Sequence, residues 1–203
     1  MEMIETRLTR AFGLTHPVVS APMAVAGGGA LAAAVTRAGG LGLIGGGYAD
    51  AGFVAGEFAA AGNQGVGIGF ITWALAERPE VLEVALAHRP RAVMLSFADP
   101  APFVPAIAAA EVPLICQVQT LKDARHAAAC GATAIVAQGS EAGGHGKKRA
   151  TLTLVPEVAD MLAAEYPATL LLAAGGIADG RGLAAALMLG ADGVLVGSRF
   201  WAS

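Results

Sequence analysis

The stretch ATLLLAAGGIADGRGLAAALMLGADGVLVGS, residues 168–198, contains one complete structural unit. Its first segment, ATLLLAA, is short and apolar, which is typical of a strand buried on both faces. Gly175 and Gly176 interrupt that segment, and the alanine- and leucine-rich residues 180–189 are compatible with a helix. A second apolar segment, DGVLVGS, begins at Asp192. This order predicts two parallel strands joined by a right-handed helical crossover.

The same unit recurs along the whole chain. Strand-like segments begin at intervals of 20 to 26 residues, with one longer interval of 36, at Pro17, Leu41, Gly65, Arg91, Val112, Ala132, Ala168 and Asp192. Helix-compatible stretches fill the seven intervals, at 30–38, 51–61, 80–88, 103–110, 121–130, 154–165 and 180–189. We therefore predict an α/β fold, a (β/α)8 TIM barrel formed by residues 1–203 as a single domain. A doubly wound open sheet is the alternative, and the even spacing of eight units disfavours it.

The end of the sequence bears on this prediction. Ser203 follows the eighth strand almost at once, so we expect the final helix and a C-terminal segment to be missing and the chain to be a fragment of a longer one. Without that helix, the flank of the eighth strand would expose apolar surface. The oligomeric state stays open, a homodimer being one option.

Composition excludes several classes of protein. The 203 residues are 55% hydrophobic and 14% charged, with a mean hydropathy of +0.60, which suits a large buried core. No apolar run approaches the roughly 18 residues of a membrane span. The net charge of −3 argues against a nucleic-acid partner. The charged start, MEMIETRLTR, predicts a cytoplasmic protein. Cys116 and Cys130 lack a metal-ligand spacing, so we expect small buried thiols and no metal.

The one long interval contains the strongest candidate for catalysis. It holds AQGSEAGGHG, residues 137–146, directly after the sixth strand. Barrel enzymes place function in loops at the carboxyl ends of their strands. Gly143 and Gly144 let a flat ligand lie against the main chain, and His145 supplies a group that titrates near neutral pH. We assign Glu141 to holding the loop by accepting backbone hydrogen bonds.

The last two strands end in features that suit a phosphate. Gly175 and Gly176 follow the seventh strand, and Gly197 and Ser198 follow the eighth. Barrels commonly bind phosphate with backbone amides of these two loops and the positive end of a helix, which Asp179 or Gly180 could open here. The alternative is that the two glycines only permit tight turns. Whether Arg199 pairs with the phosphate or with a carboxylate stays open.

The amino-terminal third adds a further candidate wall. Ala21, Pro22 and Met23 end the first strand, and their small or polarizable side chains leave room for a planar ring. The glycine-rich segment 38–47 straddles a strand, so its match to a dinucleotide-binding fingerprint is weak.

Five segments together resemble one family. PVVSAPMA, AGGLGLIGGG, AQGSEAGGH, AAGGIADGRG and LGADGVLVGSRF occur in the order found in the nitronate monooxygenases, formerly called 2-nitropropane dioxygenases, which are FMN-dependent barrel enzymes. The resemblance runs from about Leu8 to Ala202. The FMN-dependent enoyl-ACP reductases share a similar EAGGH segment, so the resemblance alone does not decide the reaction.

The resemblance implies roles for individual residues. His145 corresponds to the histidine assigned as catalytic in nitronate oxidation. The implied flavin-contacting positions, together with the glycines proposed above, are Ala21, Pro22, Met23, Gln138, Gly143, Gly144, Gly175, Gly176, Leu195, Val196, Gly197 and Ser198. Two further positions depart from the family pattern. Gly69 stands where many members have asparagine, and Gln117 stands where some have lysine, so one side-chain hydrogen bond and one positive charge near the flavin are absent.

Three functions follow as hypotheses. The first is oxidation of alkyl nitronates by FMN and O2 to a carbonyl compound and nitrite. The second is an NAD(P)H-dependent flavin oxidoreductase acting on an enoyl thioester or a quinone. The third is a truncated, non-catalytic barrel that acts as a binding module. We expect Phe70, Thr72, Trp73 and the loops after the fourth and fifth strands to form the pocket wall, whose apolar character suits a small or alkyl-bearing substrate.

Overall fold

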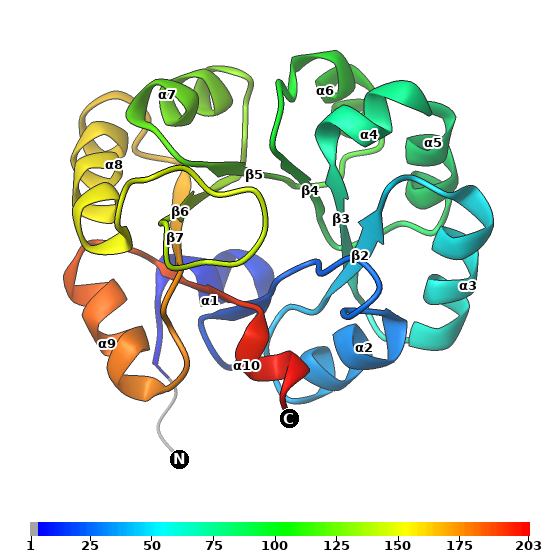
Figure 1. The fold of residues 1–203 in the computed structure, drawn as a ribbon, viewed down its shortest axis with the longest axis horizontal. Helices are drawn as coiled ribbons and strands as arrows, with labels where there is room; N and C mark the ends of the chain where they lie inside the picture. The colour runs from blue at the N-terminus through cyan, green and yellow to red at the C-terminus, as the bar shows by residue number, and fades with distance from the viewer. Residues whose placement is uncertain (1–3) are drawn as a thin grey trace.

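Eight parallel strands form the centre of the molecule. The computed structural model describes residues 4–203, and Figure 1 shows the strands surrounded by a ring of helices. The strands are paired in the order β1-β8-β7-β6-β5-β4-β3-β2. Their bounds are β1 Val18–Ser20, β2 Leu43–Gly47, β3 Gly67–Ile71, β4 Val93–Ser96, β5 Leu114–Val118, β6 Ala134–Gln138, β7 Leu170–Ala174 and β8 Gly193–Val196. All eight predicted strands are present.

The first and second strands bring the two edges of the sheet together. Val19 forms a parallel bridge with Leu41, and the Ser20 N–H donates to the Leu41 carbonyl over 2.9 Å. The buried Ser20 hydroxyl accepts a hydrogen bond from the Leu43 N–H over 3.0 Å. These bonds close the ring, so the prediction of a (β/α)8 barrel is confirmed and the open-sheet alternative is wrong.

Seven helices lie where the sequence predicts them, within a few residues. They are α2 Gly29–Arg37, α3 Ala51–Ala61, α5 Glu80–Ala87, α6 Val104–Ala109, α7 Leu121–Ala129, α8 Thr151–Glu165 and α9 Gly180–Met188. The short elements α1 Arg7–Phe12, α4 Thr72–Glu77, the 3-10 helix η1 Ala101–Phe103 and α10 Ser198–Trp201 were not predicted. Their three to six residues offer too little hydrophobic periodicity to be recognised in a sequence. None of the helices formed by residues 4–203 is long and apolar enough to cross a membrane.

Two layers of core side chains alternate along the strands. On β7, Leu171 and Ala173 pack toward the helices, whereas Leu170, Leu172 and Ala174 face the barrel interior. Leu8 and Phe12 of α1 join that interior cluster. Neighbouring residues point to opposite faces because the side-chain period of a strand is two. The inward residue at the carboxyl end of β7 is the small Ala174, which leaves that end of the barrel open to a ligand.

Candidate active site

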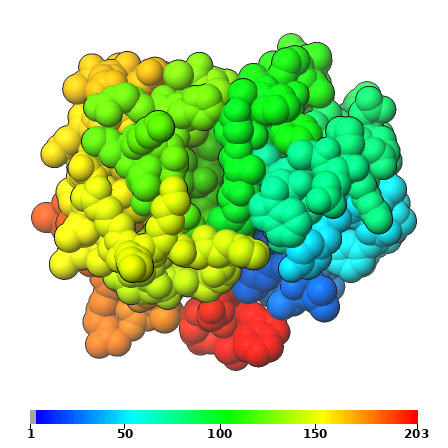
Figure 2. Space-filling model, turned by 45° about the horizontal axis from the view of Figure 1, so that its top comes forward, coloured from blue at the N-terminus to red at the C-terminus, as the bar shows by residue number. Residues whose placement is uncertain are grey.

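A cavity of about 760 Å³ opens at the carboxyl ends of the strands. In Figure 2 the loop between β6 and α8, coloured yellow to yellow-green, projects over this face, and α10 lies below it in red. Residues from the ends of β1, β3, β5, β6, β7 and β8 contribute to the wall. The wall includes the predicted catalytic residue and all but one of the predicted flavin-contacting residues, namely Ala21, Pro22, Met23, Gly69, Gln117, Gln138, Gly143, Gly144, His145, Gly175, Gly176, Leu195, Gly197 and Ser198.

Val196 is the exception. Its side chain belongs to the core between the sheet and the helices, whereas that of Leu195 faces the barrel interior. The period of two along β8 therefore excludes Val196 from the cavity. Its carbonyl instead accepts a hydrogen bond from the Ala21 N–H over 2.9 Å, which holds the end of β1 beside β8.

Three glutamines anchor the β6–α8 loop to the barrel. The buried Gln138 accepts hydrogen bonds on Oε1 from Gln117 Nε2, over 2.7 Å, and from Gln119 Nε2, over 2.5 Å. Its own Nε2 donates to the Gly143 carbonyl over 3.0 Å, and Gln119 Nε2 also donates to the His145 carbonyl over 2.6 Å. The ends of β5 and β6 thus set the path of the loop on both sides of its glycine pair. Gln119 was missed in the sequence because it lies in the turn after β5, far along the chain from the loop that it holds.

The predicted structural role of Glu141 agrees with its contacts. Its carboxylate accepts hydrogen bonds from the Thr151 N–H, at 2.9 Å, and the Thr151 hydroxyl, at 2.8 Å. The backbone hydrogen bond from Thr151 is the main cause that holds the pKa of Glu141 below its ordinary value, with the Thr151 hydroxyl adding to it. Lys147 Nζ contacts Asp123 of α7 at 2.8 Å. The contacts of Glu141 and Lys147 therefore fix both ends of the exposed part of the loop.

His145 stands at the rim of the cavity among aromatic side chains. Its ring centroid lies 5.1 Å from that of Phe97 and 6.3 Å from that of Trp73, and Tyr48 packs edge-on against Trp73. Within residues 4–203, the ring nitrogens of His145 have no hydrogen-bond partner, so both can meet a ligand. Phe97 lies in the loop after β4, which was expected to form part of the wall, whereas Tyr48, from the loop after β2, was not predicted. Of the predicted wall residues, Phe70 lines the cavity.

Thr72 does not line the cavity. It is buried at the start of α4, and its hydroxyl has no hydrogen-bond partner among the described residues. Its neighbour Trp73 reaches the rim only through the contacts with Tyr48 and His145. The expectation that residues 70, 72 and 73 share one wall was therefore right for Phe70 and wrong for Thr72.

The opposite side of the cavity is built from backbone. Gly175 and Gly176 have φ angles of +117° and +71°, which favour glycine. Among the described residues, the N–H groups of Gly176, Ile177 and Ala178 donate to no protein acceptor. The short helix α10 begins at Ser198, directly after β8, in the position from which barrels commonly direct a helix N-terminus at a phosphate.

The first turn of α9 is already satisfied. Asp179 is its N-cap, as one of the two predicted options, and its carboxylate accepts from the N–H groups of Arg181 and Gly182. A carboxylate in this position competes with an anionic ligand for the same amides. Among the described residues, the N–H groups of 176–178 and the start of α10 are therefore the groups of this side that stay free to meet a ligand. Arg199 also lines the cavity, and its guanidinium donates to the Ser203 hydroxyl.

Gly69 lies in close contact with Pro22. A Cβ atom at Gly69 would lie 2.3 Å from Pro22 Cγ, so a side chain at this position requires Pro22 to move. Glycine here and proline across from it therefore form one surface of the cavity. The other departure from the family pattern, Gln117, has its amide engaged by Gln138 and contributes no charge.

Comparisons with known proteins show which family the chain is similar to. Residues 71–203, more than half of the chain, match the family model described as nitronate monooxygenase. A nitronate monooxygenase of Neurospora crassa is 38% identical, over 96% of this chain and 63% of that protein.

Two further matches come from bacteria. The (3aS,4S,5R,7aS)-5-hydroxy-7a-methyl-1-oxo-octahydro-1H-indene-4-carboxyl-CoA dehydrogenase of Mycobacterium tuberculosis is 36% identical over 97% of this chain and 56% of that protein. The structure of FabK from Thermotoga maritima superposes with a TM-score of 0.88 and 32% identity, over 99% of this chain and 64% of that one. The chain thus spans 56 to 64% of the length of these three proteins. On the family model and these identities, the chain belongs to the nitronate monooxygenase family.

Proposed function

We propose that this chain binds FMN in the cavity and oxidises alkyl nitronates with O2, giving a carbonyl compound and nitrite. The observation that carries the proposal is the placement of His145, whose unbonded ring faces the cavity between Phe97 and Trp73, across from a cradle of backbone amides. The match to the nitronate monooxygenase model supports the same reaction.

The residues present fit the cofactor. A cavity of about 760 Å³ lies within the range of about 300 to 1,000 Å³ typical of ligand sites. The free N–H groups of residues 176–178 and the start of α10 would hold the phosphate. Ala21, Pro22, Met23 and Gly69 would border the ring system, with Gln117 and Gln138 at its polar edge. Bound FMN supplies the redox chemistry, by taking electrons from the nitronate and passing them to O2.

His145 then acts on the substrate. A protonated ring donates a hydrogen bond to the nitro oxygens of a nitronate anion, and a neutral ring removes the α-proton of a nitroalkane. Phe97, Trp73 and Tyr48 supply apolar surface beside the ring. That surface displaces water from the reacting carbon and accommodates a short alkyl group.

Anaerobic flavin reduction tests the proposal. The chain is reconstituted with FMN and mixed, without oxygen, with a nitronate in one cuvette and with NADH or NADPH in another. Rapid bleaching of the flavin by the nitronate is the expected result. Bleaching by the nicotinamide alone overturns the proposal.

The second candidate is an NAD(P)H-dependent flavin oxidoreductase acting on an enoyl thioester or a quinone. The likeness to the carboxyl-CoA dehydrogenase of Mycobacterium tuberculosis favours it, since that protein's name specifies a thioester substrate. The same experiment separates the two candidates. A colourless chain that takes up no FMN would favour the third hypothesis, a non-catalytic binding module. We place the reaction in the cytoplasm, in keeping with the free thiols Cys116 and Cys130.

A further inference from the structure

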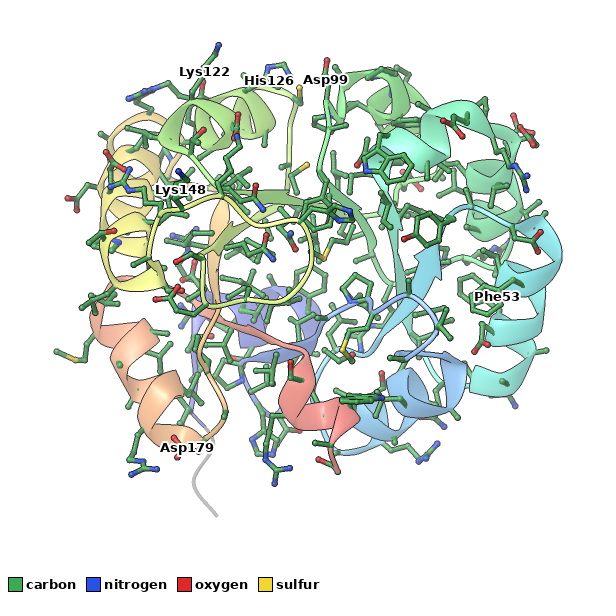
Figure 3. The ribbon with its side chains drawn as sticks, viewed as in Figure 1. Phe53, Asp99, Lys122, His126, Lys148 and Asp179 are labelled. Carbon is green, nitrogen blue, oxygen red and sulfur yellow. The ribbon has the colours of Figure 1, made fainter. Side chains whose placement is uncertain are left out.

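A second cluster of reactive side chains lies at the outer edge of the barrel. Asp99 follows β4, and His126 and Cys130 belong to α7 and its C-terminal cap. Figure 3 shows Asp99 and His126 directed toward one another from these two elements. His126 Nε2 lies 2.7 Å from Asp99 Oδ1 and 3.8 Å from Cys130 Sγ, and all three donor atoms lie within 4.8 Å of one another.

Local structure brings these donors together. Cys130 is four residues after His126, and its N–H donates to the His126 carbonyl over 3.0 Å, so the two side chains leave the same face one turn apart. Asp99 is held by the Ala101 N–H, which donates to Asp99 Oδ1 over 2.9 Å. One donor comes from the loop after β4, and two come from a rigid helix end.

The arrangement differs from that of a catalytic triad. In a triad the carboxylate contacts one imidazole nitrogen and the nucleophile contacts the other. Here Asp99 and Cys130 both approach Nε2 of His126. Three different donor atoms that lie within 4.8 Å of one another suit a cation better than a proton relay.

We propose that Asp99, His126 and Cys130 form a binding site for one divalent cation of the zinc class, with water as the fourth ligand. Zinc accepts sulfur, imidazole nitrogen and carboxylate oxygen at about 2.0 to 2.3 Å, which places tetrahedral ligands about 3.3 to 3.6 Å apart. The S···N separation of 3.8 Å is close to that value, and the N···O separation of 2.7 Å has to widen slightly. Both Asp99 and His126 are exposed and free to do so.

Binding has a defined chemical balance and a structural consequence. The Cys130 thiol loses its proton to solvent as the metal–sulfur bond forms. The proton that His126 Nε2 donates to Asp99 also leaves that nitrogen, for Nδ1 of a neutral ring or for solvent from a protonated ring, and the hydrogen bond between His126 and Asp99 is then replaced by two metal bonds. The ion would cross-link the β4–η1 loop to α7. Asp99 lies two residues after Phe97, whose ring contacts His145, so the cross-link reaches the rim of the main cavity.

This inference departs from the sequence expectation of no metal. The pair His126 and Cys130 has no recognised ligand spacing by itself, and the third donor lies 27 residues before His126 on another element. Only the folded barrel places it beside the helix. The site is separate from the cavity, so its test requires neither FMN nor turnover.

Titration of the reduced chain with Co2+ alone tests the proposal. We expect one equivalent to bind, with a thiolate-to-cobalt charge-transfer band and the visible bands of tetrahedral cobalt, both removed by added Zn2+. Cys130→Ser should abolish the charge-transfer band, and His126→Asn and Asp99→Asn should each weaken binding by more than about tenfold. Matched controls are Cys116→Ser, which removes the other thiol, and His88→Asn, which removes a histidine stacked on Phe58.

Two results would overturn the proposal. One is the absence of a thiolate band at stoichiometric Co2+ in the unmodified chain. The other is a band that survives Cys130→Ser or disappears in Cys116→Ser. Thermal unfolding provides a second readout, because a ligand that binds only the folded state raises the Tm. Zn2+ should raise the Tm of the unmodified chain and leave that of Cys130→Ser unchanged.

Discussion

The two sides of the central cavity are built in different ways. The β6–α8 loop is held by side chains, through Gln138, the pair Glu141 and Thr151, and the pair Lys147 and Asp123. The side formed after β7 and β8 is built from glycine backbone and free amides. Substitutions that remove hydrogen-bonding side-chain atoms should therefore disturb the first side of the cavity. Substitutions that add a Cβ atom to a glycine should disturb the second. Backbone amides suit an anionic group that many ligands share. The side chains of the β6–α8 loop can be replaced by others, so this loop is suited to setting substrate preference.

The largest expected effect lies on the side-chain wall. His145→Asn should retain FMN and lower nitronate turnover by about 10²- to 10⁴-fold, the usual contribution of a positioned acid or base. The aromatic neighbours Phe97 and Trp73 stay in place, so the loss would report on the imidazole itself. Steady-state kinetics measures the nitronate turnover, and flavin absorbance measures the FMN that the variant retains. His88→Asn is the control, and unchanged turnover in His145→Asn would refute the catalytic role.

The next effect tests the backbone side by adding one carbon atom. In Gly175→Ala the new Cβ would lie 2.6 Å from the Thr151 hydroxyl oxygen, at a φ of +117° that costs about 1 to 3 kcal/mol without glycine. We expect lower stability in urea unfolding and at least tenfold weaker FMN binding in a fluorescence titration.

Gly131→Ala separates strain from crowding in that experiment. Gly131 also has a positive φ, +85°, but a Cβ there would meet nothing within 4 Å. The Gly131→Ala variant should have a lower free energy of unfolding and an unchanged affinity for FMN. Equal FMN affinity in the two variants would contradict the backbone-cradle interpretation.

The fold was predictable because its signal repeats. Eight apolar segments and seven helical stretches agree with one architecture, and an error at one boundary does not alter the others. The short helices α1, α4 and α10 lacked such redundancy. α10 matters most among them, since its start lies on the side of the cavity where Gly175, Gly176, Gly197 and Ser198 were predicted to bind a phosphate.

The site was predictable only where its residues carry a signal of their own. Glycine pairs and a histidine in a long loop stand out in a sequence, so His145, Gly175 and Gly176 were named from it, and all three line the cavity. Gln119 and Phe97 have ordinary local surroundings, and they matter because the barrel brings β5 and β4 beside the β6–α8 loop. Val196 shows the opposite case. It was named as part of the final glycine-containing motif, but the alternation of side chains along β8 turns its side chain into the core and away from the cavity.

Replacing Gln138 tests how strongly the loop depends on its anchor. Gln138→Leu leaves the Gln117 and Gln119 amides without their shared acceptor, which costs about 1 to 3 kcal/mol for buried polar groups. It also frees the Gly143 carbonyl. We expect reduced stability and a raised KM for the nitronate, with Gln64→Leu as a partly exposed control. A change in stability with an unchanged KM would show that the network supports the core and not the substrate wall.

The smallest effect concerns the charge of Glu141, and it should depend on pH. Hydrogen bonds from Thr151 lower the pKa of this carboxyl in the folded state, so the carboxylate adds stability above its unfolded value, about 4.5, and that stability is lost as pH falls through the lower folded value. Because the side chain is largely exposed, Glu141→Gln should cost less than about 1 kcal/mol near neutral pH. The difference from the unmodified chain should shrink below about pH 4.5, as both side chains become neutral.

Urea unfolding of the two proteins at several pH values measures this difference. Glu111→Gln is the control, since its carboxylate forms no hydrogen bond or ion pair with residues 4–203. A difference that stays constant from neutral to acid pH would mean that the shape of the glutamate, and not its charge, holds the loop. In that case neutral hydrogen bonds, from residue 141 to Thr151 and within the glutamine network, would hold the side-chain wall together with the Lys147–Asp123 ion pair. The charge of Glu141 would then play no part in the contrast between this wall and the backbone amides on the other side of the cavity.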